Sequence, residues 1–206
     1  MARHSGTPNR STAERRAELL AKMRARLRSR SEGPPSWRDL AAAAGVSLSS
    51  LTHHFGRRED IIRAIMEDER AHGATPMAIM AEPSGAFDIS VRDAVEHLAA
   101  GLVNADLDRM IAAGLAEGLG HPVLGPAFIG NLLEPMLQAV EARLEHHVRA
   151  GEMRAGETRL AAVQLAAPII VAVLHQRPLG GAAVRPLDLD TLLVAHAEAF
   201  VRAWRA

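Results

Sequence analysis

The sequence contains no cysteine and no tyrosine, and its only lysine is Lys22. Without cysteine, the chain has no disulfide, no thiolate metal ligand and no cysteine nucleophile. Aromatic residues make up only 3% of the 206 residues, so the hydrophobic 48% consists mainly of Ala, Leu, Val, Ile and Met. Alanine and leucine favour helices, whereas sheets favour β-branched and aromatic residues. These absences predict a helical protein with an aliphatic core.

The sequence also lacks a long uninterrupted hydrophobic run. Its longest apolar stretch, Leu160 to Leu174, contains Gln164 and Pro168 and is shorter than the ~20 residues that span a bilayer. The first ten residues are polar and lack the apolar core of a signal peptide. We therefore expect a cytoplasmic protein that does not enter a membrane.

Positive and negative charges balance over the whole chain but not along it. Residues 1–63 contain 13 Arg and Lys against 6 Asp and Glu, a net charge of +7, while residues 64–206 contain 11 against 18, a net charge of −7. A basic small half joined to an acidic large half indicates a polyanionic partner for the first half. A solvated basic helix explains the same charges equally well.

Capping residues and glycines predict three helices in the basic half. Ser36 and Asp39 form a capping box, Gly45 ends the helix that follows, and Ser47 caps the next one before Gly56. Two short helices around a glycine-containing turn, after a longer helix, are typical of a helix-turn-helix unit. The helices are expected over about 11–30, 37–44 and 48–55.

The acidic half also shows helical spacing of apolar residues and no alternation with a period of two. A helix opens at Arg58, and we expect Gly73 and Pro76 to disrupt it. Ser90 and Asp188 are expected to begin later helices. These later helices are predicted over about 90–104, 107–119, 126–150, 160–174 and 188–204. The predicted fold class is therefore all-α.

Residues 37 to 62 combine an alanine-rich helix, the turn Gly45-Val46-Ser47, a helix ending in His54-Phe55, and the basic-acidic run Arg57-Arg58-Glu59-Asp60. In this order, the segment resembles the TetR family of transcriptional regulators. The resemblance implies a homodimer that binds operator DNA and holds a ligand in its C-terminal domain. The domains implied are a basic tail over 1–10, a three-helix helix-turn-helix domain over 11–57, and a helical-bundle ligand-binding and dimerisation domain over 58–206.

The second short helix is expected to enter the major groove of DNA with its N-terminal residues. The family usually has tyrosine where this chain has Thr52, which has a shorter reach, and lysine where it has Arg58. Helix capping is an alternative role for the serines. We expect Arg58→Ala to weaken binding to all sequences alike and to flatten its salt dependence. The predicted DNA-binding residues are Arg38, Ser47, Leu48, Ser49, Ser50, Thr52, His53, Arg57 and Arg58.

One helix-turn-helix covers few bases, so two copies are needed to read two half-sites. The apolar stripes of residues 159–176 and 188–204 are expected to form the homodimer interface, although packing inside one chain is the alternative. A small-molecule effector is expected in the bundle before them, and no cofactor or metal ion is expected. The candidate pocket residues are Met66, Met110, Phe128, Met136 and His175, each of which would otherwise be ordinary core.

An enzyme and a helical interaction protein are the competing functions. Ten histidines invite a metal or acid–base site, but His146 and His147 are adjacent and diverge by ~100° on a helix. No His-Glu-x-x-His, phosphate-binding glycine loop or nucleophile elbow is present, so we do not expect an enzyme. The other rival is a helical small-molecule-binding or interaction protein with weak or lost DNA binding, which Thr52 supports. We expect a repressor released by its effector, although the sequence does not separate repressor from activator.

Overall fold

The computed structural model describes residues 12–29 and 35–206. The predicted tail over residues 1–10 and the predicted cap at Ser11 lie outside the described residues. The chain divides into two compact units, Met1–Ile65 and Met66–Ala206. The division falls inside one continuous helix, whereas the sequence places the domain boundary at the start of that helix, at residue 58. Each unit is described by itself below.

Over residues 12–29 and 35–65, the first unit contains three helices and the beginning of a fourth. These are α1 (Thr12–Arg28), α2 (Trp37–Ala44), α3 (Leu48–Phe55) and the start of α4 (Arg58–Ala81). Each helix contributes buried apolar side chains, including Met23, Leu40, Leu51 and Ile61, which are fully buried. The result is a small, mainly aliphatic core formed by one longer helix, two short helices and the start of α4, as the spacing of apolar residues predicts.

The predicted caps of the two short helices are confirmed. The Ser36 hydroxyl accepts from the Asp39 N–H at 3.3 Å, and the Asp39 carboxylate accepts from the Ser36 N–H at 2.8 Å. Gly45 ends α2 with φ 70°, a left-handed conformation that favours glycine, and its N–H is donated to carbonyls of the last turn. Local sequence signals therefore determine both ends of α2 and the start of α3.

Helix α4 runs without a break from Arg58 to Ala81, so the predicted disruption at Gly73 and Pro76 is wrong. Pro76 has no N–H to donate to the His72 carbonyl, but it removes only that one hydrogen bond. Beyond Pro76, the buried Arg143 donates to the carbonyls of Ile79 at 3.3 Å and Met80 at 2.7 Å. This tertiary contact satisfies the end of the helix beyond the proline.

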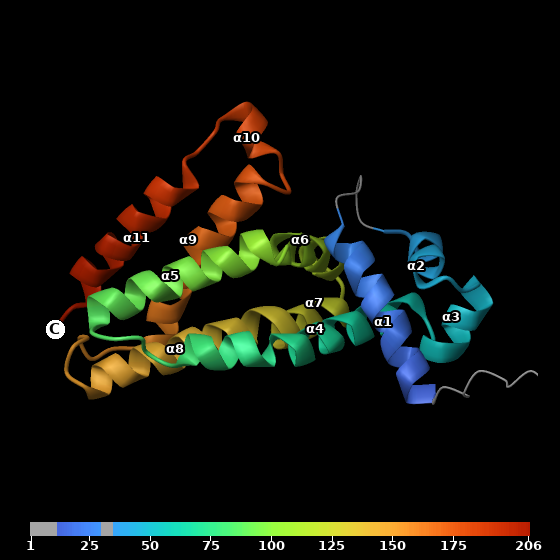
Figure 1. Ribbon diagram of the computed structural model, residues 1–206, viewed down its shortest axis with the longest axis horizontal. Helices are drawn as coiled ribbons and strands as arrows, with labels where there is room; N and C mark the ends of the chain where they lie inside the picture. Colours follow the sequence, from blue (N-terminus) through green and yellow to red (C-terminus); the bar gives the residue numbers. More distant parts are fainter. Residues whose placement is uncertain (1–11, 30–34) are drawn as a thin grey trace, which may run out of the picture. The chain divides into compact units, whose positions relative to one another are not determined.

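The second unit is a bundle formed by the later part of α4 and the helices that follow (Figure 1). The predicted start of a helix at Ser90 is wrong, because α5 begins three residues earlier and Ser90 is buried under Arg143. The helices are α5 (Phe87–Asn104), α6 (Leu107–Gly118), α7 (Leu124–Phe128), α8 (Glu134–Arg149), α9 (Thr158–Gln176), α10 (Gly181–Val184) and α11 (Leu189–Trp204). Asp188 caps α11 as predicted, through the N–H groups of Asp190 and Thr191.

The single helix expected over about 126–150 is instead three segments. A π-helical turn, η1 (Ile129–Leu133), lies between α7 and α8. Here the Glu134 N–H is donated to the Ile129 carbonyl, five residues back rather than four. Pro135 lacks an N–H for the carbonyl four residues before it, which favours this wider turn.

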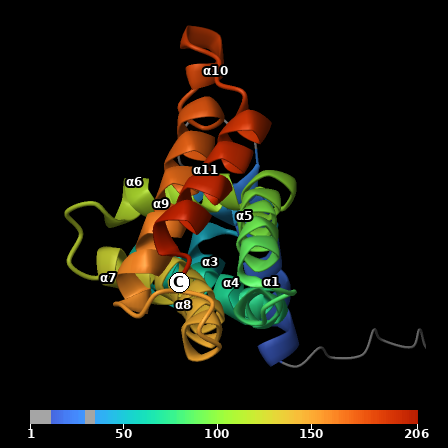
Figure 2. The ribbon, with the colours of Figure 1, turned by 90° about the vertical axis from the view of Figure 1, so that its left-hand side faces the viewer.

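Helix α9 lies in the middle of the second unit, packed against both α5 and α8, and α11 packs against α5 and α9. Figures 1 and 2 show α9 and α11 as an antiparallel pair joined through α10 at one end. At the other end, an isolated bridge joins Met153 to Arg205. Fully buried Leu165 and Ile169 of α9 and Val140 of α8 form part of the core of this unit.

Candidate nucleic-acid interface and effector cavity

The predicted recognition helix, α3, buries one face and exposes the other. Leu51 and Phe55 are buried in the core of the first unit. The predicted DNA-binding side chains of this helix lie on the other face: Ser47, Leu48, Ser49, Thr52 and His53 are exposed, and Ser50 is half-buried. The N-terminal end of the helix therefore presents hydroxyl groups to solvent beside a single exposed leucine.

Several of these hydroxyl groups already take part in hydrogen bonds. The Ser47 side chain accepts from the Ser50 N–H at 3.1 Å and lies 2.9 Å from the Ser49 hydroxyl. The Thr52 hydroxyl donates to the Leu48 carbonyl at 2.9 Å. Ser47 thus caps the helix. The proton of Thr52 is used inside the helix, while the hydroxyl oxygen keeps its capacity to accept.

The predicted phosphate-binding arginines differ in their surroundings. Arg38 and Arg57 are exposed, whereas Arg58 is half-buried and donates to the Pro35 carbonyl at 3.3 Å. The Arg57 N–H donates to Asp60, and this bond, followed by the bond from Arg63, lowers the pKa of the Asp60 carboxyl. Arg38 and Arg57 are therefore the exposed cations of this set, and Arg58 also links α4 to the segment before α2.

Arg16 of α1 is a functional candidate that sequence reasoning did not single out. Its guanidinium donates to the His54 carbonyl at 2.7 Å and lies 4.2 Å above the centre of the Phe55 ring. It therefore holds the C-terminal end of α3, through a charge-assisted hydrogen bond and a cation–π contact. No signal separates Arg16 from the other arginines of that helix, because only the packing of α1 against α3 selects it.

The second unit contains a partly open cavity of about 160 Å³ between its helices. Its walls come from α4, α5, α6, the π-helical turn and α8, and most of its lining side chains are apolar. Four polar side chains also line it: Glu69, Arg70, His97 and Asn131. Ligand sites are commonly mostly apolar cavities with a few polar groups that orient the ligand. We call this space the bundle cavity.

Of the candidate pocket residues, Met136 lines the bundle cavity. Met66, Met110 and Phe128 are buried but do not line it, and Phe128 packs closely against Gly114. His175 is exposed near the end of α9. The cavity residues that the sequence did not indicate come from several helices, and no local pattern connects them.

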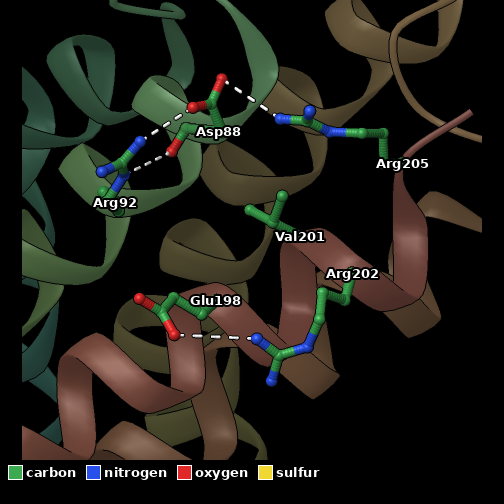
Figure 3. Close-up of a pocket in the computed structure, with 6 residues that line it drawn as sticks. All are labelled: Asp88, Arg92, Glu198, Val201, Arg202 and Arg205. Atoms are coloured by element: carbon green, nitrogen blue, oxygen red, sulfur yellow. Dashed lines mark hydrogen bonds and ion pairs between the residues drawn. The ribbon is translucent and has the colours of Figure 1, made fainter.

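A larger and more open groove of about 420 Å³ lies between the start of α5 and the end of α11. Figure 3 shows its charged side chains paired with one another. Asp88 accepts from Arg92 at 2.8 Å and lies 3.4 Å from Arg205, while Arg202 lies 3.7 Å from Glu198. The Asp88–Arg205 pair joins the start of α5 to the end of α11. Because the charged side chains of the groove are paired with one another, the groove is a weaker ligand site than the bundle cavity.

The predicted dimerisation helices have both a buried and an exposed apolar side. On α9, Leu165 and Ile169 are buried, while Leu160, Val163 and Val171 are exposed, Val171 to 64%. Helix α9 is also long and apolar enough to cross a membrane by length and composition alone, a test that core helices of soluble proteins pass as well. The buried side of α9 packs inside the chain, and the interface between copies stays a prediction for its exposed apolar side.

Among the described residues, no group of three or more His, Asp and Glu side chains could hold a metal ion.

No family model matches the chain. No curated protein matches it either. Solved structures do match over nearly the whole length. A TetR-family regulator from Mesorhizobium loti is 19% identical with a TM-score of 0.71, covering 96% of this chain and 100% of that chain. The chain has the TetR-family fold.

Two further structures with this fold were solved with ligands. A transcriptional regulator from Saccharomonospora viridis in complex with choline is 16% identical, with a TM-score of 0.73 over 94% of this chain and 99% of that one. FadR from Bacillus subtilis in complex with stearoyl-CoA is also 16% identical, with a TM-score of 0.65 over 93% and 98%. The all-α fold predicted from the sequence is thus confirmed, and the family resemblance of residues 37–62 agrees with the fold of the whole chain.

Proposed function

We propose that this protein is a homodimeric, cytoplasmic DNA-binding transcription regulator, and a repressor whose operator affinity is lowered by a small molecule bound in the bundle cavity. The observation that carries the proposal is the exposed N-terminal end of α3, with Ser47, Ser49 and Thr52 on one surface. This end belongs to a helix-turn-helix in the basic part of a chain with the TetR-family fold. A helix of this kind fits the major groove.

Affinity for DNA would come mainly from the arginines. Exposed guanidinium groups such as Arg38 and Arg57 neutralise phosphates and release counterions, which makes binding depend on salt. The serine hydroxyls both donate and accept, so they discriminate weakly between bases. Two half-sites read by two copies would restore specificity.

Regulation would follow from linkage between the two binding sites. A ligand that binds better to one conformation of the dimer shifts the population toward it, and lowers DNA affinity if that conformation spaces the recognition helices wrongly. Helix α4 carries Arg58 and Asp60 in the first unit and cavity-lining Glu69 and Met77 in the second. A continuous helix with residues of both sites would carry this coupling.

The ligands of the similar structures support a sensing role for the bundle. Choline and stearoyl-CoA differ greatly in size, so proteins of this fold accommodate very different molecules. An enzymatic function has no support among the described residues, because the charged side chains of the open groove form ion pairs and most of the wall of the bundle cavity is apolar. We therefore assign the bundle cavity a sensing rather than a catalytic role.

Selection of bound fragments from a random double-stranded DNA library, followed by fluorescence anisotropy with the selected sequence, tests the DNA-binding part. We expect a two-fold symmetric motif to be enriched. Arg57→Ala should weaken binding to selected and random DNA alike and reduce the slope of log affinity against log salt by about 1. Arg154→Ala, which removes an exposed arginine of the second unit, is the matched control and should leave both unchanged.

Failure to enrich any sequence would contradict the proposal. It would favour a helical small-molecule-binding protein that has lost DNA binding. One observation favours this alternative. The Thr52 hydroxyl donates its proton to the Leu48 carbonyl, so it has no proton left to donate to a DNA phosphate.

A further inference from the structure

The size of the bundle cavity limits what it can hold. An apolar cavity of about 150 Å³ is large enough for benzene, and the bundle cavity has about 160 Å³. Two residues of its wall, Gly73 on α4 and Gly101 on α5, have no side chain. A Cβ atom added at Gly73 would meet no neighbouring atom within 4 Å, and one added at Gly101 would meet only Leu107, at 3.6 Å. A ligand held here is therefore about the size of one ring.

The buried part of the wall is apolar. Leu98, Leu102, Ile111 and Met136 are buried and line the cavity. A charged group that moves from water against such side chains loses its hydration, which is costly unless an opposite charge compensates it. The charge that a ligand can carry therefore depends on the charged residues of the wall.

Three titratable side chains line the cavity: Glu69, Arg70 and His97. Glu69 is only 6% exposed, and it already takes part in an interaction within the chain. Arg70 is exposed, so water and salt screen its charge. The formal charges of Glu69 and Arg70 also cancel. These two residues therefore give the cavity no net charge that would compensate an ammonium or a carboxylate group of a ligand.

His97 is the titratable group of the wall that can bond to an uncharged ligand. It is half-buried on α5, and its ring makes no hydrogen bond or ion pair with the part of the chain that the structure describes. A neutral imidazole donates through one nitrogen and accepts through the other. Asn131, the remaining polar residue of the wall, is uncharged, and its amide already donates to the Ala127 carbonyl at 2.9 Å. His97 therefore offers the polar contact for a neutral group.

We infer that the bundle cavity binds an uncharged molecule of one ring, with a single neutral hydrogen-bonding group, such as a hydroxyl, that bonds to His97. The leucine, isoleucine and methionine side chains of the wall contact the ring. The polar group orients the ligand, as in other mostly apolar sites. The role of this molecule as an effector rests on the function proposed above, whereas its binding to the cavity does not.

Four probes of similar shape test the inference by NMR titration of the full-length protein without DNA, at about pH 8, where an ordinary imidazole is uncharged. They are the neutral benzyl alcohol and toluene, the cationic benzylamine and the anionic benzoate. We expect benzyl alcohol to bind at least about tenfold more tightly than either ion, a difference that corresponds to about 1.4 kcal/mol. Equal or tighter binding of benzylamine or benzoate would overturn the inference.

The methyl signals of the methionines locate the bound probe in the same titration. Met77 and Met136 line the cavity, and their signals should shift on addition of benzyl alcohol. Met153 is buried outside the lining, and its signal should stay in place. Shifts at Met153 without shifts at Met77 and Met136 would contradict the site.

Variants of His97 test the polar contact. His97→Leu should weaken benzyl alcohol binding about fivefold and leave toluene unchanged, because only benzyl alcohol loses a hydrogen bond. His97→Gln keeps a donor and an acceptor without a charge, so it should retain most of the affinity for benzyl alcohol. His146→Leu, which alters an exposed histidine of α8 outside the cavity, is the matched control. An unchanged affinity in His97→Leu, or an equal loss in His97→Gln, would contradict the neutral hydrogen bond.

Two further variants fill the cavity. Gly101→Leu and Gly73→Leu each add a side chain to the wall, and each should abolish binding of every probe. Thermal melting shows whether each variant is folded, and the second variant serves if the first does not fold. Binding of benzyl alcohol that survives in a folded variant would place the site elsewhere and refute the inference.

The same probes, added to the complex with a selected DNA fragment, separate the two proposals. Release of DNA by benzyl alcohol supports both. Binding of benzyl alcohol without any effect on DNA supports the site and contradicts its effector role. Release of DNA by benzylamine or benzoate alone, through a cavity that Gly101→Leu blocks, supports the regulator and contradicts the uncharged ligand.

Discussion

The recognition helix illustrates how one residue can serve the fold and a binding surface together. Ser47 is exposed at the end of α3 expected to meet DNA, yet its hydroxyl accepts from the Ser50 N–H and so begins the helix. Thr52 is also exposed, and its hydroxyl donates within the helix. For substitutions at such positions, the change in folding stability and the change in DNA affinity must be measured separately, because they have different physical causes.

Ser47 permits this separation directly. Ser47→Ala removes the cap and should lower the free energy of unfolding by about 1 kcal/mol. Ser47→Asp keeps a good capping residue, so it should preserve stability while its negative charge weakens DNA binding. Urea denaturation and fluorescence anisotropy measure the two quantities. Ser84→Asp, an exposed serine of the second unit, is the control. Unchanged DNA affinity in Ser47→Asp would show that this helix end lies away from the phosphates.

Asp60 gives a prediction about pH. The N–H of Arg57, and then Arg63, lower the pKa of the Asp60 carboxyl below its ordinary value of 3.8. A lowered folded-state pKa means that Asp60 stabilises the first unit above that ordinary value, and that this stabilisation is lost as pH falls through the folded-state pKa. Asp60→Asn should therefore be less stable than the natural chain at about pH 7, and the difference should shrink in acid.

Carboxyl NMR titration gives the pKa of Asp60 directly, and urea denaturation at neutral and acidic pH gives the stability difference. A pKa at or above the ordinary value would contradict the hydrogen bond from Arg57. A stability difference independent of pH would show that Asp60→Asn acts through packing and not through charge.

At the scale of elements, Arg143 on α8 determines how three helices meet. Its guanidinium is 2% exposed and donates to the Ile79 and Met80 carbonyls at the end of α4, to Ser90 within α5, and to Asp93 at 3.0 Å. At the end of α4, these bonds supply a donor to the Met80 carbonyl and a second donor, beside the Glu82 N–H, to the Ile79 carbonyl. The end of α4 beyond Pro76 is thus anchored in the second unit by a side chain far away in the sequence.

Arg143→Met should destabilise the protein by about 1–3 kcal/mol, because it leaves the buried acceptors Met80 carbonyl and Ser90 hydroxyl without the donor they have now. Arg143→Lys keeps the charge but cannot donate in so many directions, so it should recover only part of the loss. Arg149→Met, an exposed arginine on the same helix, is the matched control. Urea denaturation measures all three. A loss below about 1 kcal/mol for Arg143→Met would show that water replaces these bonds at little cost.

At the scale of the whole molecule, the proposed regulator requires two copies. The exposed sides of α9 and α11 offer Leu160, Val163, Val171 and Val194 beside small residues such as Ala195 and Ala199. Small side chains allow helices to approach closely, and an isologous interface uses the same surface on both copies. These two helices therefore remain the best candidates for a four-helix contact between copies.

Val171→Glu should convert a dimer into a monomer and weaken binding to a two-fold symmetric DNA site, because the charge would be buried at the centre of the contact. Light scattering after gel filtration measures the mass in solution. Ile89→Glu, which alters an exposed isoleucine of α5 outside these helices, should leave the mass unchanged. Circular dichroism checks that both variants are folded. A dimer that persists in Val171→Glu would place the interface on another surface.

The sequence alone determined the helical class and the helix-turn-helix, because caps, glycine turns and apolar spacing act over a few residues. Ser36, Gly45, Ser47 and Asp188 all terminate or begin helices where local chemistry predicts. The asymmetry of charge and the motif of residues 37–62 were likewise readable without coordinates. DNA binding, however, remains a prediction based on those local features.

Only the tertiary structure decided what depends on distant residues. It showed that α4 continues through Pro76, since Arg143 holds its end, and that α5 begins at Phe87 instead of Ser90. It also selected Arg16 among many arginines and gathered the lining of the bundle cavity from five segments. Such contacts join residues tens of positions apart. Their energies come from burial and geometry in the folded chain, which no local pattern of residue types contains.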